Sequence, residues 1–162
     1  MIEVRHDDPK ENAMTYTHHL TLDQPYAQAV ESVRAALSEQ GFGIITEIDM
    51  RATFERKLDA DAAEEIGDYI ILGACNPSLA RRALAAEPQL GALLPCNVIV
   101  RASTEDGRSI IEAMDPKVMV QLSDSDDVRA VADDADARLR AALTVCARGE
   151  EQFPAAGRHR PM

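Results

Sequence analysis

NVIVRASTEDGRSIIEAM, residues 97–114, is the stretch that decides the fold class of this 162-residue chain. Residues 97–103 and 109–114 are rich in Val and Ile, which favour strands, and Asp106-Gly107 between them is typical of a hairpin turn. A hairpin this tight joins antiparallel strands, because parallel neighbours need a long crossover connection. The stretch therefore predicts a mixed or mostly antiparallel sheet, as in an α+β domain.

Three more strands and five helical segments are predicted around the hairpin. Strands are expected at residues 14–22, 42–50 and 69–75, where apolar residues alternate or form short β-branched runs. Helical segments are expected, from apolar spacing and terminal residues, at 25–40, 51–58, 78–87, 117–122 and 123–149. The predicted order is β-α-β-(α)-β-α-β-β-α-α, an α+β fold of about five strands with helices packed on one face.

Several segments carry more specific expectations. Alternation along 42–50 places the even-numbered side chains on one face and Glu47 and Asp49 on the other. The acidic residues 59–68 are expected to form a mobile connection without a helix. The last helix has one apolar stripe, formed by Val128, Val131, Ala135, Leu139, Ala142 and Cys146. We expect a single domain over residues 14–148, with flexible segments at 1–13 and 149–162.

The charge of the chain narrows the classes of partner. The formal net charge is -11, which repels phosphate backbones, so we expect no nucleic-acid partner. The polar first residues carry no apolar signal region, and no apolar run approaches the ~20 residues that span a bilayer. We therefore expect a cytoplasmic protein without a membrane partner, in which cysteines stay reduced.

The dipeptide Cys-Asn occurs twice, as Cys75-Asn76 and Cys96-Asn97, in a chain with only three cysteines. Cys75 ends a predicted strand, and Asn76-Pro77 is a typical helix start, where backbone amides favour an anion. If the strands beginning at 69 and 97 are antiparallel, both cysteines lie at the same end of the sheet. They then either form a site or are small buried residues that fit tight turns.

Metal ligands and catalytic motifs are less evident. Two cysteines 21 residues apart lack the short spacings of a zinc site, although His18 or Glu47 could complete one in space. Glu47 and Asp49 project from one strand face, as a cation site or as a solvated surface. No nucleophile elbow, phosphate-binding loop or zinc-protease motif occurs. The residues therefore assign no metal and no cofactor, and they leave open whether the chain is an enzyme.

Four motifs together resemble the domain-of-unknown-function family 302. They are GFGIITEIDM (41–50), YIILGACNPSLARRALAAEP (69–88), GALLPCNVIV (91–100) and EAMDP (112–116), and the resemblance extends over about 14–146. It implies a compact α+β domain that forms a homodimer, and it implies no established activity. The recurrent family positions correspond here to Gly41, Gly43, Thr46, Glu47, Asp49, Gly73, Cys75, Asn76, Pro77, Leu94, Pro95, Cys96, Asn97, Asp115 and Pro116.

Three functional hypotheses follow. The first is a small-ligand or metal-ion binding module, with its site formed by Cys75, Asn76, Cys96 and Asn97 and with Glu47 and Asp49 nearby. The second is a structural homodimer without catalysis. The third is a thiol-based enzyme or redox protein, with Cys75 as nucleophile and Cys96 as resolving partner.

Overall fold

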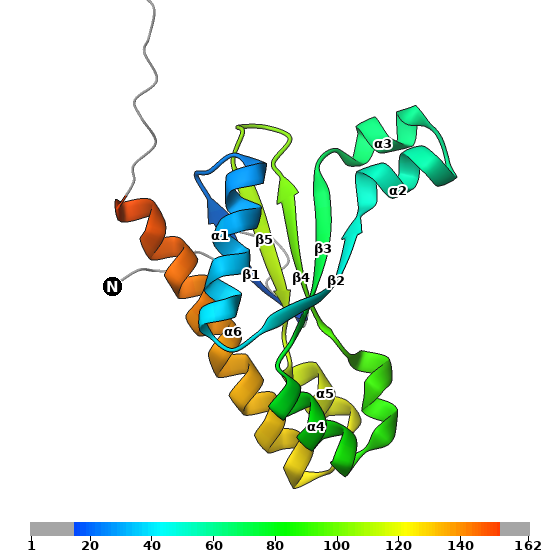
Figure 1. The fold of residues 1–162 in the computed structure, drawn as a ribbon, viewed down its shortest axis with the longest axis vertical. Helices are drawn as coiled ribbons and strands as arrows, with labels where there is room; N and C mark the ends of the chain where they lie inside the picture. Colours follow the sequence, from blue (N-terminus) through cyan, green and yellow to red (C-terminus); the bar gives the residue numbers. More distant parts are fainter. Residues whose placement is uncertain (1–14, 153–162) are drawn as a thin grey trace, which may run out of the picture.

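A five-stranded antiparallel sheet forms the centre of the molecule in the computed structural model, which describes residues 15–152 and side chains as far as residue 149 (Figure 1). The predicted flexible segment 1–13 lies outside the described residues, as does Met14 at the start of the first predicted strand. Of the predicted flexible segment 149–162, residues 149–152 belong to the last helix and the rest lies outside the described residues. The strands are β1 (Thr17–Leu22), β2 (Gly43–Asp49), β3 (Tyr69–Cys75), β4 (Cys96–Ala102) and β5 (Ser109–Met114). Their order in the sheet is β1-β5-β4-β3-β2.

Every pair of neighbouring strands is antiparallel, including the β4–β5 hairpin that the sequence predicts. The predicted α+β class is therefore confirmed, and its mixed alternative is not needed. Gly107 adopts a φ of 71° in the hairpin turn, a left-handed conformation that favours glycine. The register aligns Ala74 with Cys96 and Gly73 with Asn97, so β3 ends where β4 begins.

The helices gather on one face and at the two ends of the sheet. They are α1 (Tyr26–Glu39), α2 (Met50–Lys57), α3 (Ala60–Ile66), α4 (Pro77–Ala86), the 3-10 helix η1 (Pro88–Leu93), α5 (Lys117–Leu122) and α6 (Asp126–Gln152). Helices α1 and α6 lie side by side over the sheet, α4 and α5 pack on the other half of α6, and α2 and α3 project from the opposite end (Figure 1).

Two hydrophobic clusters stabilise this arrangement. The first cluster lies between the sheet, α1 and the later part of α6, and includes Leu37, Leu72 and Leu139. The second lies between α4, η1, α5 and the earlier part of α6, and includes Leu79, Met119 and Val131. All six residues of the predicted apolar stripe on α6 are buried, so this one helix connects both clusters.

Two predictions about local structure were wrong. Residues 60–66 form α3 rather than a connection, because the Asp59 carboxylate accepts a hydrogen bond from the Ala62 amide (2.8 Å) and caps the helix. In β2, the register shifts between Ile44 and Thr46, so strict alternation fails. Ile44 consequently pairs with buried Ala74 on the helix-covered face, together with Glu47 and Asp49, while Thr46 faces the other way.

The other face of the sheet is not covered by the helices that form the two hydrophobic clusters of the described residues. Cross-strand pairing aligns Ile48, Ile71 and Ile99 in one row across β2, β3 and β4, and the row continues to Glu112 on β5. We call this surface the open face. Apolar side chains here are unusual, because the solvent-facing side of an antiparallel sheet is normally polar.

Candidate functional site

The two Cys-Asn pairs meet at one end of the sheet. Since β3 and β4 are antiparallel, Cys75 at the end of β3 lies diagonally opposite Cys96 at the start of β4, which pairs with Ala74. Cys75 and Cys96 are both free thiols. Cys96 is buried and 6% exposed, whereas Cys75 is half-buried. The sequence-based expectation that the two thiols share one end of the sheet is therefore fulfilled without a disulfide.

A cavity, here called the junction pocket, lies where the two hydrophobic clusters meet. Its lining combines residues of both clusters with the ends of β3 and β4: Phe42, Ala74, Cys75, Asn76, Leu79, Ala80, Ala83, Leu94, Pro95, Cys96, Met119, Val131 and Ala135. The empty space is about 370 Å³ when counted with its open mouth, and only about 30 Å³ admits the centre of a water-sized molecule. The pocket therefore suits a molecule of a few heavy atoms.

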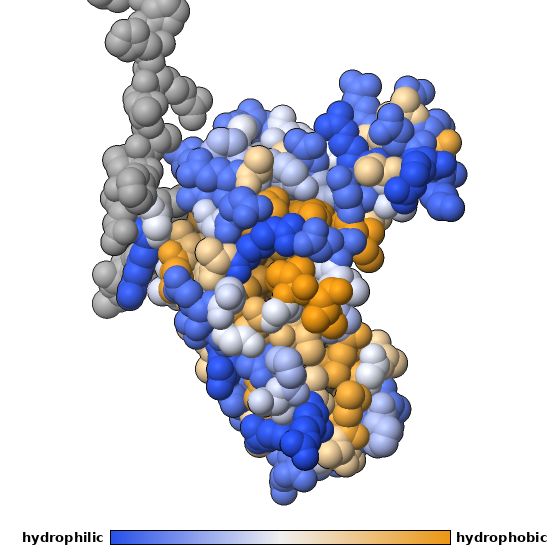
Figure 2. All heavy atoms as spheres, viewed as in Figure 1, coloured by the Kyte–Doolittle hydropathy of each residue, from blue (hydrophilic) through white to orange (hydrophobic). Residues whose placement is uncertain are grey.

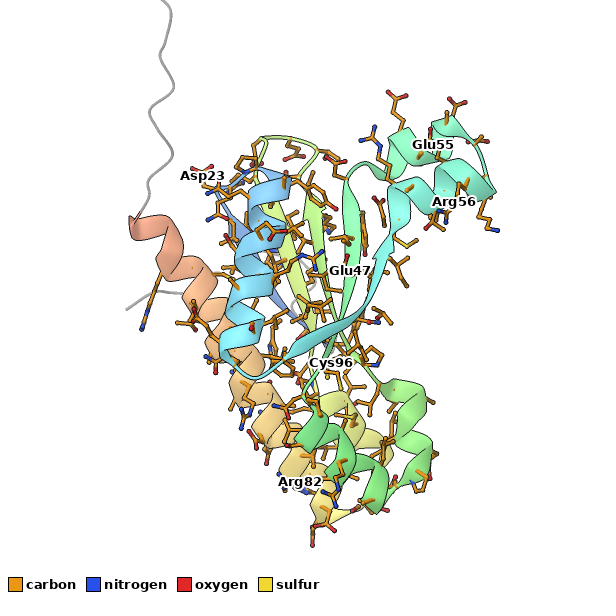
Figure 3. The ribbon with its side chains drawn as sticks, in the orientation of Figure 1. Asp23, Glu47, Glu55, Arg56, Arg82 and Cys96 are labelled. Carbon is orange, nitrogen blue, oxygen red and sulfur yellow. The ribbon has the colours of Figure 1, made fainter. Side chains whose placement is uncertain are left out.

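The surroundings of the pocket are apolar. Figure 3 labels Cys96 where the sheet meets the group of α4, α5 and α6, and Figure 2 shows apolar surface over this part of the molecule. Burial raises the pKa of the Cys96 thiol to about 11, and the neighbouring Cys75 adds to the rise. At neutral pH Cys96 is therefore a protonated, weak hydrogen-bond donor rather than a nucleophilic thiolate.

The N-terminus of α4 offers little to an anion, although the sequence suggested it. The Asn76 side chain accepts a hydrogen bond from the Leu79 amide (3.1 Å), as the predicted cap. The Ala80 amide bonds the Asn76 carbonyl (2.9 Å), and Pro77 has no N–H. In the first turn of α4, this leaves the Ser78 amide as the N–H group that could bind an anion. A single amide is a weak anion site, so the pocket is better suited to a neutral molecule.

The structure does not bring every predicted site residue to the pocket. Glu47 pairs with Leu72 across the strands, which places it about 10 Å along β3 from Cys75. Its carboxylate instead forms an ion pair with Arg34, and the hydrogen bond from Arg34 lowers the pKa of Glu47 below its ordinary value. Asp49 caps α2 through a hydrogen bond from the Ala52 amide (2.9 Å). Asn97 is exposed and pairs with Gly73 on the open face.

A second group of polar side chains lies between β1, α5 and α6. His18 Nε2 is 2.6 Å from Asp136 Oδ1 and 3.8 Å from Asp115 Oδ1. One ligand-type atom from each of the three residues lies within 4.8 Å of the others, the arrangement of a metal site. Asp136 is 6% exposed, and it is the buried carboxylate of the described residues.

Charge pairing explains how Asp136 is accommodated. Arg140 Nε is 3.0 Å and Lys117 Nζ 3.6 Å from its Oδ2. Burial raises the pKa of Asp136, but hydrogen bonds from His18 and Arg140 outweigh burial and leave it below its ordinary value. We call His18, Asp115 and Asp136 the β1–α6 cluster.

Sequence reasoning missed the β1–α6 cluster as a group. It named His18 only as a residue that could complete a zinc site with the cysteines, and Asp115 only as a recurrent family position. In the structure, Asp115 Oδ1 also accepts a hydrogen bond from the Lys117 amide (2.9 Å). Asp136 carried no signal, because it is one of several aspartates in α6. Its only distinguishing feature is its place beside Ala135 in the buried stripe, where a charge must find a partner.

An antiparallel sheet with helices on one face and a small apolar pocket defines a compact α+β domain, and comparison with known proteins gives its family. The family described as "Domain of unknown function DUF302" matches residues 18–145, so the chain belongs to this family. A crystal structure titled as an uncharacterized conserved DUF302 protein from Bacillus stearothermophilus is similar in fold, with a TM-score of 0.70 and 21% sequence identity. The similarity covers 82% of this chain and 99% of that one.

Two further comparisons bear on function. No functionally curated protein matches the chain. Among the helices of residues 15–152, none combines the length and the apolar character that crossing a bilayer requires.

Proposed function

We propose that this chain is a binding module for a small, neutral and mainly apolar molecule, held in the junction pocket. The observation that carries the proposal is the position of the pocket, whose apolar lining comes from both hydrophobic clusters and from the ends of β3 and β4. An unfilled space in a core lowers stability by losing packing contacts, whereas a bound apolar molecule restores them. Binding would thus join α4 more firmly to the sheet.

The lining suggests the chemistry of the ligand. Six of the thirteen lining residues are apolar side chains of α4, α5 and α6, and they favour an aliphatic group. The thiols of Cys75 and Cys96 offer weak donors to one polar atom of the ligand. A carboxylate would lose more hydration here than these groups return, so an alcohol or a ketone fits better.

The proposal can be tested with three probes of one shape and different charge: isobutanol, isobutyrate and isobutylamine. Each is titrated into uniformly 15N-labelled protein, and the amide shifts of Cys75, Asn76 and Cys96 are followed. We expect saturable shifts with isobutanol, and at least about tenfold weaker binding of the two ions, a difference of about 1.4 kcal/mol.

Ala80→Leu provides the matching variant, because Ala80 is half-buried in the pocket wall on α4. Its larger side chain should occupy the space and abolish the shifts. Ala85→Leu is the control, because Ala85 is exposed on the same helix and does not line the pocket. Unsaturable shifts in the wild type, or equal binding by both variants, would contradict the proposal.

A homodimer formed through the open face is the second candidate function. The row of Ile48, Ile71 and Ile99 is apolar and partly open to solvent, with Ile48 44% exposed and the other two half-buried. Apolar surface of this kind can mark an association site. A second copy suits it better than an oppositely charged partner, because the open face is close to neutral in a chain of net charge -11. Its Arg101 lies 3.1 Å from Glu112.

Sedimentation equilibrium tests this candidate directly. Ile71→Glu places a charge in the middle of the row and should shift a dimer to a monomer. Ile45→Glu is the control, because Ile45 lies in the bulge of β2, outside the row, and is 61% exposed. If the wild type sediments as a monomer at high micromolar concentration, this candidate fails.

The thiol-enzyme hypothesis has weaker support. Its resolving residue would be Cys96, whose raised pKa of about 11 disfavours the thiolate that exchange requires.

Free thiols are nevertheless part of the proposed pocket, so we propose that the chain works in a reducing compartment such as the cytosol. Oxidised and reduced protein should then differ in isobutanol binding, with the reduced form binding more tightly.

A further inference from the structure

We propose that the β1–α6 cluster, formed by His18, Asp115 and Asp136, is a binding site for a divalent transition-metal ion. The site is distinct from the junction pocket and does not depend on it. Its three members come from β1, from the turn between β5 and α5, and from α6, so that residues 118 positions apart in the chain converge. Nothing in the sequence motifs assigns these residues a ligand.

Two carboxylates of the cluster converge on a single nitrogen atom of His18. His18 Nε2 is close to oxygens of both Asp136 (2.6 Å) and Asp115 (3.8 Å). A proton on this nitrogen can be donated along one direction only, so it cannot serve both oxygens well. A cation among the three atoms interacts with all of them at once.

The distances between the potential ligand atoms are close to those found around a bound metal ion. A tetrahedral metal with bonds of roughly 2.0–2.2 Å holds its ligands roughly 3.3–3.6 Å apart. The observed separations of 2.6 and 3.8 Å lie on either side of this range. The third separation, between the oxygens of Asp115 and Asp136, is within 4.8 Å. Adjustments of about 1 Å, shared among the three side chains, would therefore produce metal geometry.

The surrounding cations approach the far oxygen of Asp136, and Asp115 Oδ1 already accepts a hydrogen bond from the Lys117 amide (2.9 Å). A carboxylate oxygen has a second lone pair, with which Asp115 Oδ1 can bind a metal ion. Lys117 and Arg140 approach Oδ2 of Asp136, whereas Oδ1 faces His18. Asp115 is held in place by the hydrogen bond from the Lys117 amide, and its own amide donates to the Tyr16 carbonyl (2.8 Å). The cluster thus has an outer shell that orients two of its ligands.

The β1–α6 cluster can be reached by an ion from solvent. The side chains of His18 and Asp115 are 16% and 20% exposed, while that of Asp136 is 8% exposed. An ion can therefore enter from the His18 side and keep water in its remaining positions. One imidazole and two carboxylates suit zinc, cobalt or manganese better than magnesium, which prefers oxygen ligands alone.

Cobalt(II) titration of the full chain in chelator-treated buffer tests the proposal. Bound Co²⁺ reports its ligands by visible absorption, and thiolate ligands would add a separate band in the near ultraviolet. We expect a one-to-one visible band without the thiolate band. The variants are His18→Gln and His19→Gln, two neighbouring histidines on opposite faces of β1.

His18→Gln should weaken Co²⁺ binding by about tenfold or more, whereas His19→Gln should change it by less than about twofold. His19 is the matched control because its ring lies near Thr21 and Glu112, away from the cluster. His6 and His159 remain in both variants, so their contribution to Co²⁺ binding cancels in the comparison.

A variant that fails to fold would be recognised by circular dichroism. Asp115→Asn then serves as the second variant, since it changes the more exposed carboxylate and should also weaken binding by about tenfold. Equal affinity of the His18→Gln and His19→Gln proteins, a thiolate band, or no visible band in the wild type would overturn the proposal.

Discussion

Thr46 occupies the space that a side chain on Gly73 would need. A Cβ atom built on Gly73 would lie 2.0 Å from Thr46 Oγ1 and 2.8 Å from Pro95 Cγ. Thr46 comes from β2 and Pro95 precedes β4, so the two neighbours of β3 close over its glycine from both sides. Three of the four sequence motifs therefore meet at one packing contact on the open face.

Gly73→Ala should destabilise the protein by about 1–3 kcal/mol, because the added methyl group overlaps Thr46 and the Pro95 ring. The free energy of unfolding is measured by urea denaturation. Gly91→Ala is the control, since its Cβ would meet its nearest neighbour, Leu84, at an ordinary 3.6 Å. A double variant, Gly73→Ala with Thr46→Ala, should recover part of the loss, and additive losses would refute the contact.

Cys96 predicts how stability changes in alkaline solution. Its thiol has a pKa of about 11 in the folded protein, against an ordinary value of 9.0. Between these values the unfolded chain loses the proton first, so the folded state holds more protons and becomes less stable as the pH rises. The loss should reach about 2–3 kcal/mol between pH 9 and 11.

The measurement is chemical denaturation at several alkaline pH values. In Cys96→Ala this part of the pH dependence should disappear, whatever the absolute stability of the variant. Cys75→Ala should keep most of it, because burial is the main cause of the raised pKa and Cys75 only adds to it. Parallel pH profiles for the wild type and Cys96→Ala would show that the thiol is not perturbed.

The two asparagines of the Cys-Asn pairs should differ in importance. Asn76→Ala removes the cap of α4 and should cost about 1 kcal/mol of stability, whereas Asn76→Asp should restore most of it. Asn97→Ala should change stability by less than about 0.5 kcal/mol, because Asn97 is exposed on β4. Thermal unfolding of the three variants measures these changes in stability. Equal losses of stability in Asn76→Ala and Asn97→Ala would contradict the role of Asn76 as the cap of α4.

Asp136 should matter more than its neighbours on α6. In chelator-treated buffer, Asp136→Ala should lower stability by about 3 kcal/mol, because it leaves His18 and Arg140 without their buried partner. Asp134→Ala, which removes an exposed ion pair with Arg138, should cost less than about 1 kcal/mol.

The same carboxylate predicts an acid dependence. Its pKa lies below the ordinary value in the folded state, so it contributes stability that is present at neutral pH. That contribution is lost as the pH falls through its ordinary pKa toward the lower folded value. Asp136→Asn should therefore flatten the acid side of the stability profile, and an unchanged profile would argue against this ion pair.

Sequence patterns determined much of the architecture. The Val- and Ile-rich arms around Asp106-Gly107 predicted the hairpin, and the apolar stripe from Val128 to Cys146 predicted the buried face of α6; both are confirmed. These features are local, since a turn or a helical stripe needs only residues close in the chain. The convergence of Cys75 and Cys96 followed from one further step, the antiparallel pairing of two strands.

Only the tertiary structure decided where the polar residues act. The β2 bulge after Ile44 sends Glu47 toward Arg34, and a periodic pattern cannot reveal an extra residue in a strand. The junction pocket takes its lining from both hydrophobic clusters, which are formed by residues far apart in the chain. His18 and Asp136, 118 residues apart, come together through the docking of α6 against β1. Such contacts depend on how whole elements pack, whereas the sequence periodicity of each element specifies only the face that it buries.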